Sequence, residues 1–276
     1  MKLRHRIMPI LSTLLFAFRM TLLPNVLAQQ PPARTTGNPL TTPSRPLTYL
    51  PLVASQRDEP CGSIPGESYS TLTVNPPPTD RPAESHPDLN LALRGYVATN
   101  KYRGLIDYGG SSDSSAPQLA GLFADHRAPN ILSVDQVYDW DWANNRRGAL
   151  ITSPEVTLMS VATVPGETLH VPSSGYAIGD GYEVLVLYVG ADRITLKYTR
   201  EDNVIQGYTI HVENICPEPR LRQLYAEMVN AGRQRLPALR AGQAFGRASG
   251  GQIGVAIRDQ GAFMDPRSRK DWWQGY

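Results

Sequence analysis

EVLVLYV, residues 183–189, is a nearly continuous apolar run in the C-terminal half of the chain. A run of this kind is typical of a strand buried on both faces of a sheet. The next segment, residues 193–199, alternates apolar and polar residues. Asp202-Asn203 then supplies a hairpin turn into a further strand over residues 204–212. These neighbouring segments predict a sheet that dominates the C-terminal half.

One helix interrupts the predicted strands. Pro219 opens it, apolar residues repeat at helical spacing from Leu221 to Val229, and Gly232 ends it. Strand character returns over residues 253–257, where apolar residues alternate. The C-terminal half is therefore predicted to be mainly β with a single inserted helix.

The preceding region, residues 61–147, has mixed signals. Extended pieces are predicted over residues 70–74, 91–97 and 104–108, and Ser115 caps one short helix. This pattern indicates a smaller α+β region, so the fold class of the whole chain is mainly β and α+β overall.

Two glycine-punctuated stretches carry a resemblance to a known family. They are VPGETLHVP at residues 164–172 and GQAFGRASGGQIGVAIRDQGAFMDP at residues 242–266. Glycines fall where tight turns need positive φ, and alternating apolar residues lie between them. The order resembles the barrel-sandwich domain of lysostaphin-type zinc endopeptidases over residues 150–273, although other barrel-sandwich domains share such turns. The resemblance implies a barrel-sandwich hybrid domain, a duplicated hybrid motif, over residues 148–276.

The metal ligands of that family are missing from this sequence. The family holds zinc with a His-x-x-x-Asp pair and a His-x-His on a strand, and a catalytic zinc needs three protein ligands and an open position for water. The matching positions here are Val156 and Ser160 for the first motif, and Gln252 and Gly254 for the second. Neither motif occurs elsewhere in the chain. We therefore expect a fold relative without a metal site or a cofactor.

One histidine of the family pattern is retained. The stretch GYTIHV, which contains His211, resembles the strand that carries a further catalytic histidine near the family's zinc. A lone histidine does not activate water as a zinc site does. The alternative is a half-buried strand histidine with a hydrogen-bond partner.

The first 28 residues have the layout of a secretory signal. Basic residues precede an apolar stretch over residues 7–18, and Val26-Leu27-Ala28 is a small-residue cleavage site. Arg19 and Pro24 interrupt the apolar stretch, which disfavours a membrane span, although an uncleaved anchor is the alternative. Cleavage would remove four of the 27 basic residues and none of the 25 acidic ones, so the net charge would change from +2 to −2. The mature charge gives no indication of nucleic-acid binding.

The exported chain would begin with a stalk and contain two cysteines. Residues 29–60 are rich in Pro, Thr, Gln, Arg and Ser, a composition that predicts disorder. Cys61 and Cys216 form an even pair in an oxidising compartment, so we predict one disulfide between them. The sequence thus indicates a secreted, extracellular or cell-envelope protein with no membrane span in its mature form.

VYDWDW at residues 137–142 is the most unusual string outside the resemblance. In a strand, Tyr138, Trp140 and Trp142 would share one face and Asp139 and Asp141 the other. This arrangement predicts an aromatic platform for a sugar ring, with paired carboxylates as acid and base. The alternative is an aromatic face that covers the core beneath solvated aspartates.

Arginines gather around the predicted helix and its exit. Arg233 and Arg235 are candidates for bidentate contacts to an anionic surface polymer. The alternative is a solvated helix face.

His86 could join Asp88 and the Asp107 or Asp113 region in a further candidate, an oxygen-rich metal site that would suit calcium more than zinc, although the spacing matches no calcium loop. For Asp88 and Asn90 the alternative is turn formation.

The preferred hypothesis is an exported, non-catalytic scaffold or binding protein of the cell envelope or extracellular space, whose partner is peptidoglycan or a surface polysaccharide. The alternative is an enzyme. It is either a divergent zinc peptidase that uses His170 or His211, or a glycan hydrolase that uses Asp139 and Asp141. Convergence of at least three histidines and carboxylates in one cavity would favour the enzyme.

Overall fold

The computed structural model describes residues 61–276. The predicted signal segment (1–28) and stalk (29–60) lie outside the described residues. Within residues 61–276, no helix is long and apolar enough to cross a membrane. The chain is mainly β, as predicted from its sequence. Cys61 and Cys216 form the predicted disulfide.

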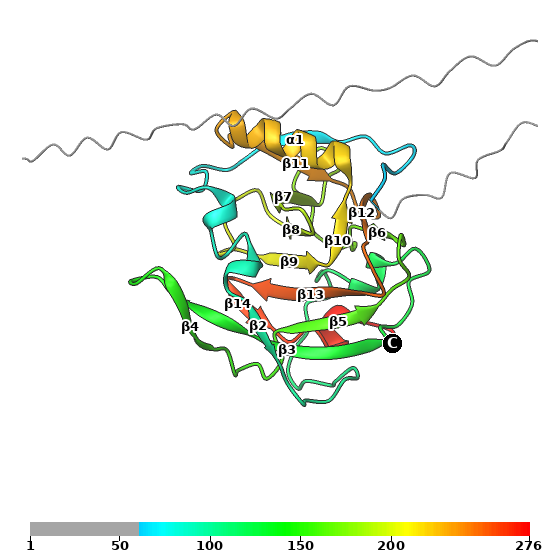
Figure 1. Cartoon of the computed structure of the whole chain (residues 1–276). Helices are drawn as coiled ribbons and strands as arrows, with labels where there is room; N and C mark the ends of the chain where they lie inside the picture. The colour runs from blue at the N-terminus through cyan, green and yellow to red at the C-terminus, as the bar shows by residue number, and fades with distance from the viewer. Residues whose placement is uncertain (1–60) are drawn as a thin grey trace, which may run out of the picture. The chain divides into compact units, whose positions relative to one another are not determined.

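A large antiparallel sheet runs through the molecule in the order β1-β11-β7-β8-β9-β13-β5-β3-β2, with β4 paired to β3 and β14 to β13. Figure 1 shows these strands following one another from β11, beneath helix α1, down to β3. Their bounds are β1 Ser70–Thr73, β2 Tyr96–Ala98, β3 Ile131–Asp141, β4 Arg146–Leu150, β5 Leu158–Ala162, β7 Val184–Val189, β8 Arg193–Lys197, β9 Tyr208–Glu213, β11 Arg235–Leu239, β13 Gln252–Asp259 and β14 Ala262–Met264.

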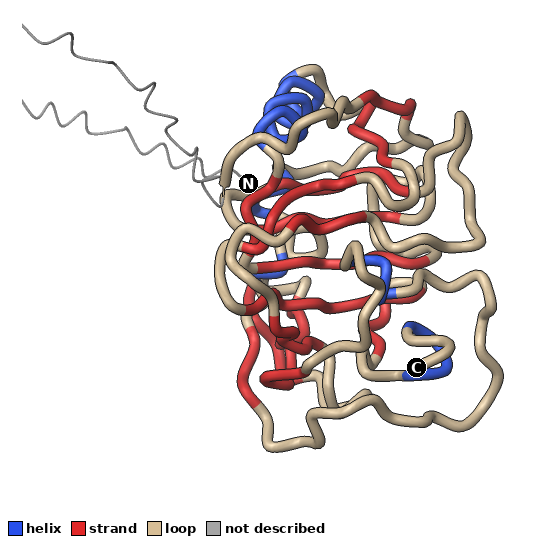
Figure 2. The backbone as a smooth tube through the Cα atoms, turned by 90° about the vertical axis from the view of Figure 1, so that its right-hand side faces the viewer, coloured by secondary structure: helices blue, strands red, loops and turns tan. Residues whose placement is uncertain are grey.

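A second, three-stranded sheet has the order β10-β12-β6. Its strands are β6 Thr168–His170, β10 Ile215–Pro217 and β12 Ala244–Ala248. Two α-helices and three short 3-10 helices complete the fold: α1 Pro219–Asn230, α2 Arg269–Trp272, η1 Ala83–Ser85, η2 Leu91–Leu93 and η3 Leu119–Leu122. Figure 2 shows α2, near the C-terminus, beside the lower strands.

The segments predicted as separate regions share the large sheet. β5 pairs with β3 on one side and with β13 on the other. Residues from both predicted regions also pack together in one main hydrophobic cluster. β4 spans the boundary predicted between residues 147 and 148.

The two faces of the central strands differ in character. Because side chains alternate along a strand and paired residues point to the same side, the register assigns each residue to a face. The apolar face packs with Leu169 and Phe245 of the second sheet in the main core. The other side, which we call the polar face, consists of Arg193, Thr195, Lys197, Thr209, His211, Glu213, Gln252, Gly254, Ala256, Arg258, Leu158 and Ser160.

The predicted buried strand and helix are confirmed. Every residue of β7 is buried. Helix α1 begins at Pro219, and the side chain of Glu218 accepts hydrogen bonds from the first backbone N–H groups. This cap satisfies donors that have no partner within the helix.

The predicted hairpin turn at Asp202-Asn203 is wrong. β8 ends at Lys197 and β9 begins only at Tyr208, so a longer loop joins them. Asp202 is buried in that loop and holds Arg233, which fixes it in the interior instead of at a turn.

Two other local predictions also differ from the structure. Residues 91–93 form η2 instead of a strand, because the side chain of Asn90 accepts a hydrogen bond from Ala92 N and caps this turn. The helix predicted after Ser115 is only the 3-10 turn η3. Gln118 is extended and donates its N–H to Ser173, so the helix cannot start earlier than Leu119.

Candidate functional site

Three of the four positions that match the zinc motifs of the resembled peptidases, Ser160, Gln252 and Gly254, lie on the polar face of the sheet. Ser160 on β5 lies directly opposite Gly254 on β13, and Gly254 lies opposite Glu213 on β9. Gln252 pairs with Ala162 at the exposed end of β13. Val156 precedes β5 and packs in the main apolar core. These positions therefore bring together a hydroxyl, an amide and a glycine, and Glu213 is the nearest carboxylate in the register.

No metal centre is formed by the part of the chain that the structure describes. Residues 61–276 contain no group of three or more His, Cys, Asp or Glu side chains placed to hold a metal ion. Glu213 is held by Arg193, whose Nη1 lies 2.9 Å from Oε1 of the carboxylate. Burial raises the pKa of Glu213, and the charge of Arg193 opposes that rise.

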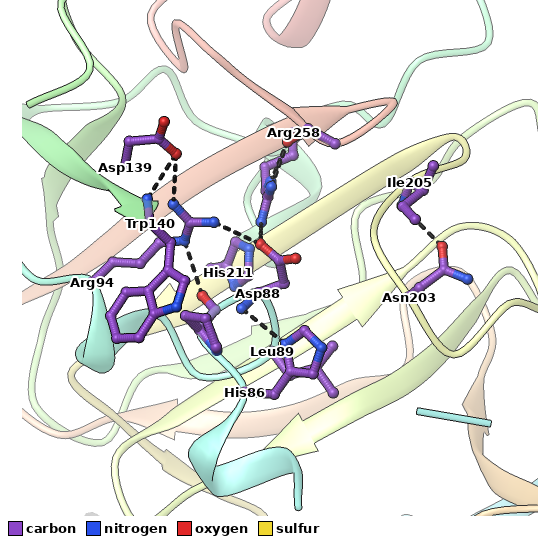
Figure 3. A network of polar contacts seen from close by, with 12 residues as sticks. His86, Asp88, Leu89, Arg94, Asp139, Trp140, Asn203, Ile205, His211 and Arg258 are labelled. Carbon is purple, nitrogen blue, oxygen red and sulfur yellow. Dashed lines mark hydrogen bonds and ion pairs between the residues drawn. The ribbon is translucent and has the colours of Figure 1, made fainter. Parts of the chain in front are cut away.

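Residues 86–95, which we call the covering segment, lie over the polar face. Leu91 of this segment packs with Leu158 and Ala256 of the sheet in a small apolar cluster that also contains Val137 and Phe263. Leu89, Leu91 and Arg94 are all buried. The covering segment thus places an apolar side chain in the cluster with Leu158, and Leu158 and Glu213 are the side chains nearest to Gly254. Figure 3 shows Asp88, Leu89 and Arg94 gathered near His211 and Arg258 of the sheet.

His211 lies on β9 beneath the covering segment and is fully buried. Its Nδ1 lies 3.0 Å from the hydroxyl oxygen of Thr195. That hydroxyl donates to the carbonyl of Leu89 at 2.6 Å, so it accepts from Nδ1–H of His211. Nε2 then carries the lone pair, and it has no hydrogen-bond partner among the described residues.

The surroundings of His211 keep its imidazole neutral. Burial is the largest cause, and the charges of Arg258 and Arg94 add to it, so the pKa falls to about 3. The ring of Phe263 stacks on the imidazole with centroids 6.3 Å apart. His211 is the buried, hydrogen-bonded strand histidine that was one of the two alternatives from the sequence, and the covering segment separates it from solvent.

Asp88 joins the covering segment to the sheet. Its Oδ1 accepts hydrogen bonds from Nη2 of Arg94 at 2.8 Å and from Nη1 of Arg258 at 2.7 Å (Figure 3). Burial alone would raise the pKa of Asp88, but the two guanidinium groups outweigh it and lower the pKa. Both guanidinium groups also lie over the ring of Phe263. Asp88 lies in the turn predicted from the sequence, at residues 87–89, and its carboxylate forms structural ion pairs with two arginines instead of joining the predicted metal site.

The two aspartates predicted as acid and base do not form a catalytic pair. Asp139 is 67 % exposed and accepts a hydrogen bond from Arg94 at 3.3 Å. Asp141 accepts from Asn144 and Arg146 in the β3–β4 hairpin, and these bonds lower its pKa. A general acid needs a raised pKa, so Asp141 is poorly suited to that role.

The aromatic residues of the same strand lie in different surroundings. A register irregularity between Tyr138 and Trp140 interrupts the alternation on β3. The indole nitrogen of Trp140 is buried without a partner among the described residues. Trp142 is 48 % exposed, and its ring meets that of His86 edge-on at 5.7 Å. Of the three, Trp142 offers the largest exposed aromatic surface.

The remaining histidines do not converge on His211. His126 and His170 line a cavity of about 470 Å³ whose lining contains no carboxylate. His86 lies on the covering segment, where its Nδ1 accepts a hydrogen bond from Asp88 N at 3.2 Å. The convergence that would favour an enzyme is therefore absent among residues 61–276.

The two candidate arginines stabilise the fold. Arg233 is buried, forms a bidentate pair with Asp202, and donates to the Tyr225 hydroxyl. Arg235 is exposed, but its guanidinium donates to Thr71 and Thr73 of β1. The groups predicted to bind a polymer are thus engaged within the protein.

Sequence reasoning missed Arg94 and Arg258. The alternation over residues 252–258 places Arg258 on the same face as Gly254, and this signal could have identified it as a polar residue of the site. Nothing in the local sequence indicates that Arg94 approaches the same carboxylate.

Comparison of the chain with protein-family models, with curated proteins and with solved structures gives no match. The resemblance to lysostaphin-type peptidases therefore depends on the sequence motifs alone and stays a prediction.

Proposed function

We propose that this protein is an exported, non-catalytic scaffold or binding protein of the cell envelope or extracellular space, and that its C-terminal part is a peptidase-like barrel-sandwich domain without a metal site. The observation that carries the proposal is the position of Leu91. It packs on Leu158 and Ala256, on the face that would hold the zinc and the substrate of an active relative.

A hydrolase needs an activated water and a place for the substrate beside it. At the corresponding positions this chain has Ser160 and Gly254, which supply no basic group, and the side chain beside Gly254 is that of Leu158, which packs in one cluster with Leu91 of the covering segment. His211 is neutral and lies beneath that segment, so it has no path to a substrate.

Export is supported by the signal-like sequence of residues 1–28 and by the disulfide between Cys61 and Cys216. Disulfides persist in oxidising compartments and are rare in the cytosol.

The proposed ligand is peptidoglycan or a surface glycan. Because Ser160, Gly254 and His211 are buried, such a ligand must bind elsewhere on the surface. Trp142 is the best-placed residue for it, because an exposed indole offers an apolar face for a sugar ring. The guanidinium of Arg81 lies 5.5 Å from the ring of Trp142 and holds it in place.

Co-sedimentation with purified bacterial cell-wall sacculi tests the proposal. The mature chain, residues 29–276, should pellet with the sacculi and release no soluble fragments, with or without added Zn²⁺. A heat-unfolded sample should stay in the supernatant. Trp142→Ala should reduce the pelleted fraction, whereas Tyr102→Ala, at another exposed aromatic residue, should not.

Two results would reject the proposal. If the folded chain stays in the supernatant, the wall ligand is wrong. If it releases soluble amino or reducing groups, the protein is an enzyme and the covering segment must move.

A further inference from the structure

A small cavity at the end of the β8–β9 loop combines aromatic rings with carboxylates. Its volume is about 230 Å³. The lining residues are Asp113, Tyr176, Tyr198, Thr199, Gly207, Tyr208, Asp259 and Gln260. Three tyrosines and two aspartates therefore face one space, and this space is separate from the polar face beneath the covering segment.

The cavity wall is rigidly built. The hydroxyl of Tyr176 donates to Oδ2 of Asp113 at 2.6 Å, and that of Tyr208 donates to the same oxygen at 2.9 Å. The two rings lie 6.0 Å apart, and Trp272 supports Tyr208 edge-on at 5.5 Å. Gly175 approaches Ser115 so closely that an added Cβ would lie 2.4 Å from its hydroxyl. These contacts fix the rings before any ligand arrives.

Within the described part of the chain, neither carboxylate has a directly paired cation, although the ammonium of Lys197 donates to the carbonyl of Gly207 in the cavity wall and its charge acts on Asp259. Among residues 61–276, neither Asp113 nor Asp259 takes part in an ion pair, whereas the buried carboxylates of Asp202 and Asp265 each hold an arginine. Burial raises the pKa of Asp259, Lys197 opposes that rise, and the charge of Asp113 adds to it. A cation in the cavity would relieve the repulsion between the two aspartates.

We propose that this cavity binds a primary ammonium group, such as the end of a lysine side chain in a peptide. An ammonium ion is attracted both by carboxylates and by the faces of tyrosine rings. The small volume suits one such group and excludes a drug-sized molecule. Oδ2 of Asp113 already accepts two hydroxyls and Oδ1 accepts Ser115 N, which favours an organic cation over a metal ion that needs several free oxygens. This proposal goes beyond the proposed wall binding and does not depend on it.

Titration of the ¹⁵N-labelled mature chain with tri-lysine peptide, N-acetylated and C-amidated, tests the proposal by NMR. The amide signals of Gly207 and Gln260 should shift with a dissociation constant of about 1 mM. The same peptide acetylated on each Nε should give no shift there. Asp259→Asn should weaken binding roughly tenfold, because it removes one of the two charges while the hydrogen bonds of Asp113 stay intact.

Asp80→Asn is the matched control, because Asp80 is exposed and lies outside the cavity. It should leave the dissociation constant unchanged. Asp113→Asn should weaken binding as Asp259→Asn does, and a circular dichroism spectrum checks that each variant is folded. Equal shifts by the acetylated peptide, or unchanged affinity in folded Asp259→Asn, would overturn the proposal. Saturation of the same signals by micromolar CaCl₂ would also overturn it and assign the cavity to a metal ion.

Discussion

Asp88 and Arg258 lie 170 positions apart in the sequence, and Oδ1 of the aspartate accepts a hydrogen bond from Nη1 of the arginine at 2.7 Å. Arg94 donates to the same oxygen. One carboxylate therefore bridges two guanidinium groups that are both nearly excluded from solvent, and Asp139 supplies Arg94 with a second, exposed partner. Removal of a single partner from such a buried cluster leaves uncompensated charge, which costs far more than the loss of an exposed pair.

Asp88→Asn should lower the free energy of unfolding by about 3–5 kcal/mol, because Arg258 would stay buried without a paired carboxylate and Arg94 would keep only the exposed Asp139. Urea unfolding at pH 7 measures the change. The matched control is Asp80→Asn, since the Asp80 side chain is 88 % exposed. That control should change stability by no more than about 0.5 kcal/mol. Similar losses in both variants would mean that the covering segment is held by other contacts.

Most of the fold of the C-terminal half could be predicted because its signals are local. The apolar run at residues 183–189 gave a strand that is buried throughout, and Pro219 with Gly232 bracketed helix α1. The turn at Asp202-Asn203 could not be predicted. The residue types of this turn favour a hairpin, but the buried ion pair between Asp202 and Arg233 overrides that preference.

The candidate site was harder to predict, because its contacts join distant segments. The missing ligands at Ser160 and Gly254 could be identified from the motif pattern alone. The role of Leu91 could not, because nothing in residues 86–95 indicates that they cross the sheet beside Leu158 and Ala256. Asp88 lies in the turn predicted from its residue type, but its ion pair with Arg258 on β13 could not be predicted.

The pH dependence of stability should reflect His211. Its folded-state pKa of about 3 lies below the ordinary value of 6.5, so the folded protein favours the neutral ring. The stability that this provides is complete above about pH 6.5 and is lost as the pH falls toward 3. His211→Asn keeps a donor for Thr195 but does not titrate. Between pH 7 and 4.5 the original chain should lose up to ~3 kcal/mol more than the variant.

Urea midpoints of both proteins at several pH values check this prediction. Glu213 and Asp135 titrate in the opposite sense, since their pKa values are raised, but they are present in both proteins and cancel in the comparison. If the stability of the two proteins falls in parallel with pH, the acid-induced loss of stability is not caused by His211.

The disulfide should contribute strongly to stability, because Cys61 and Cys216 close a loop with a sequence separation of 155. In the chain-entropy model, a bridge that closes a loop of this size raises the free energy of unfolding by about 4–5 kcal/mol, because it restricts the unfolded chain. Real bridges often stabilise by less. Dithiothreitol should therefore lower the urea midpoint of the original chain. The double variant Cys61→Ser, Cys216→Ser should start at that lower midpoint and not respond to the reductant. A midpoint unaffected by reduction would show that the N-terminal region is held by β1 alone.

Lys197 should be a destabilising residue that can be replaced with a gain. It is fully buried on the polar face, and its ammonium donates to one carbonyl, that of Gly207, at 3.3 Å. Burial lowers its pKa to about 8, although Glu201 opposes the fall. At pH 7 the folded protein must keep a charged ammonium that burial disfavours, and this lowers the free energy of unfolding. The loss shrinks as the pH rises from the folded pKa of about 8 toward the ordinary value of 10.5.

Lys197→Met removes the charge and keeps the length of the side chain, so it should raise the free energy of unfolding at pH 7 by up to ~3 kcal/mol. The gain should fall to about 1 kcal/mol at pH 10, because both states of the original chain then approach neutrality at this residue. Lys101→Met, at an exposed lysine, should show neither the gain nor the pH trend. If Lys197→Met instead destabilises the fold at pH 7, then the ammonium is stabilised by Glu201 and Asp259 more than burial penalises it, and the polar face needs that cation.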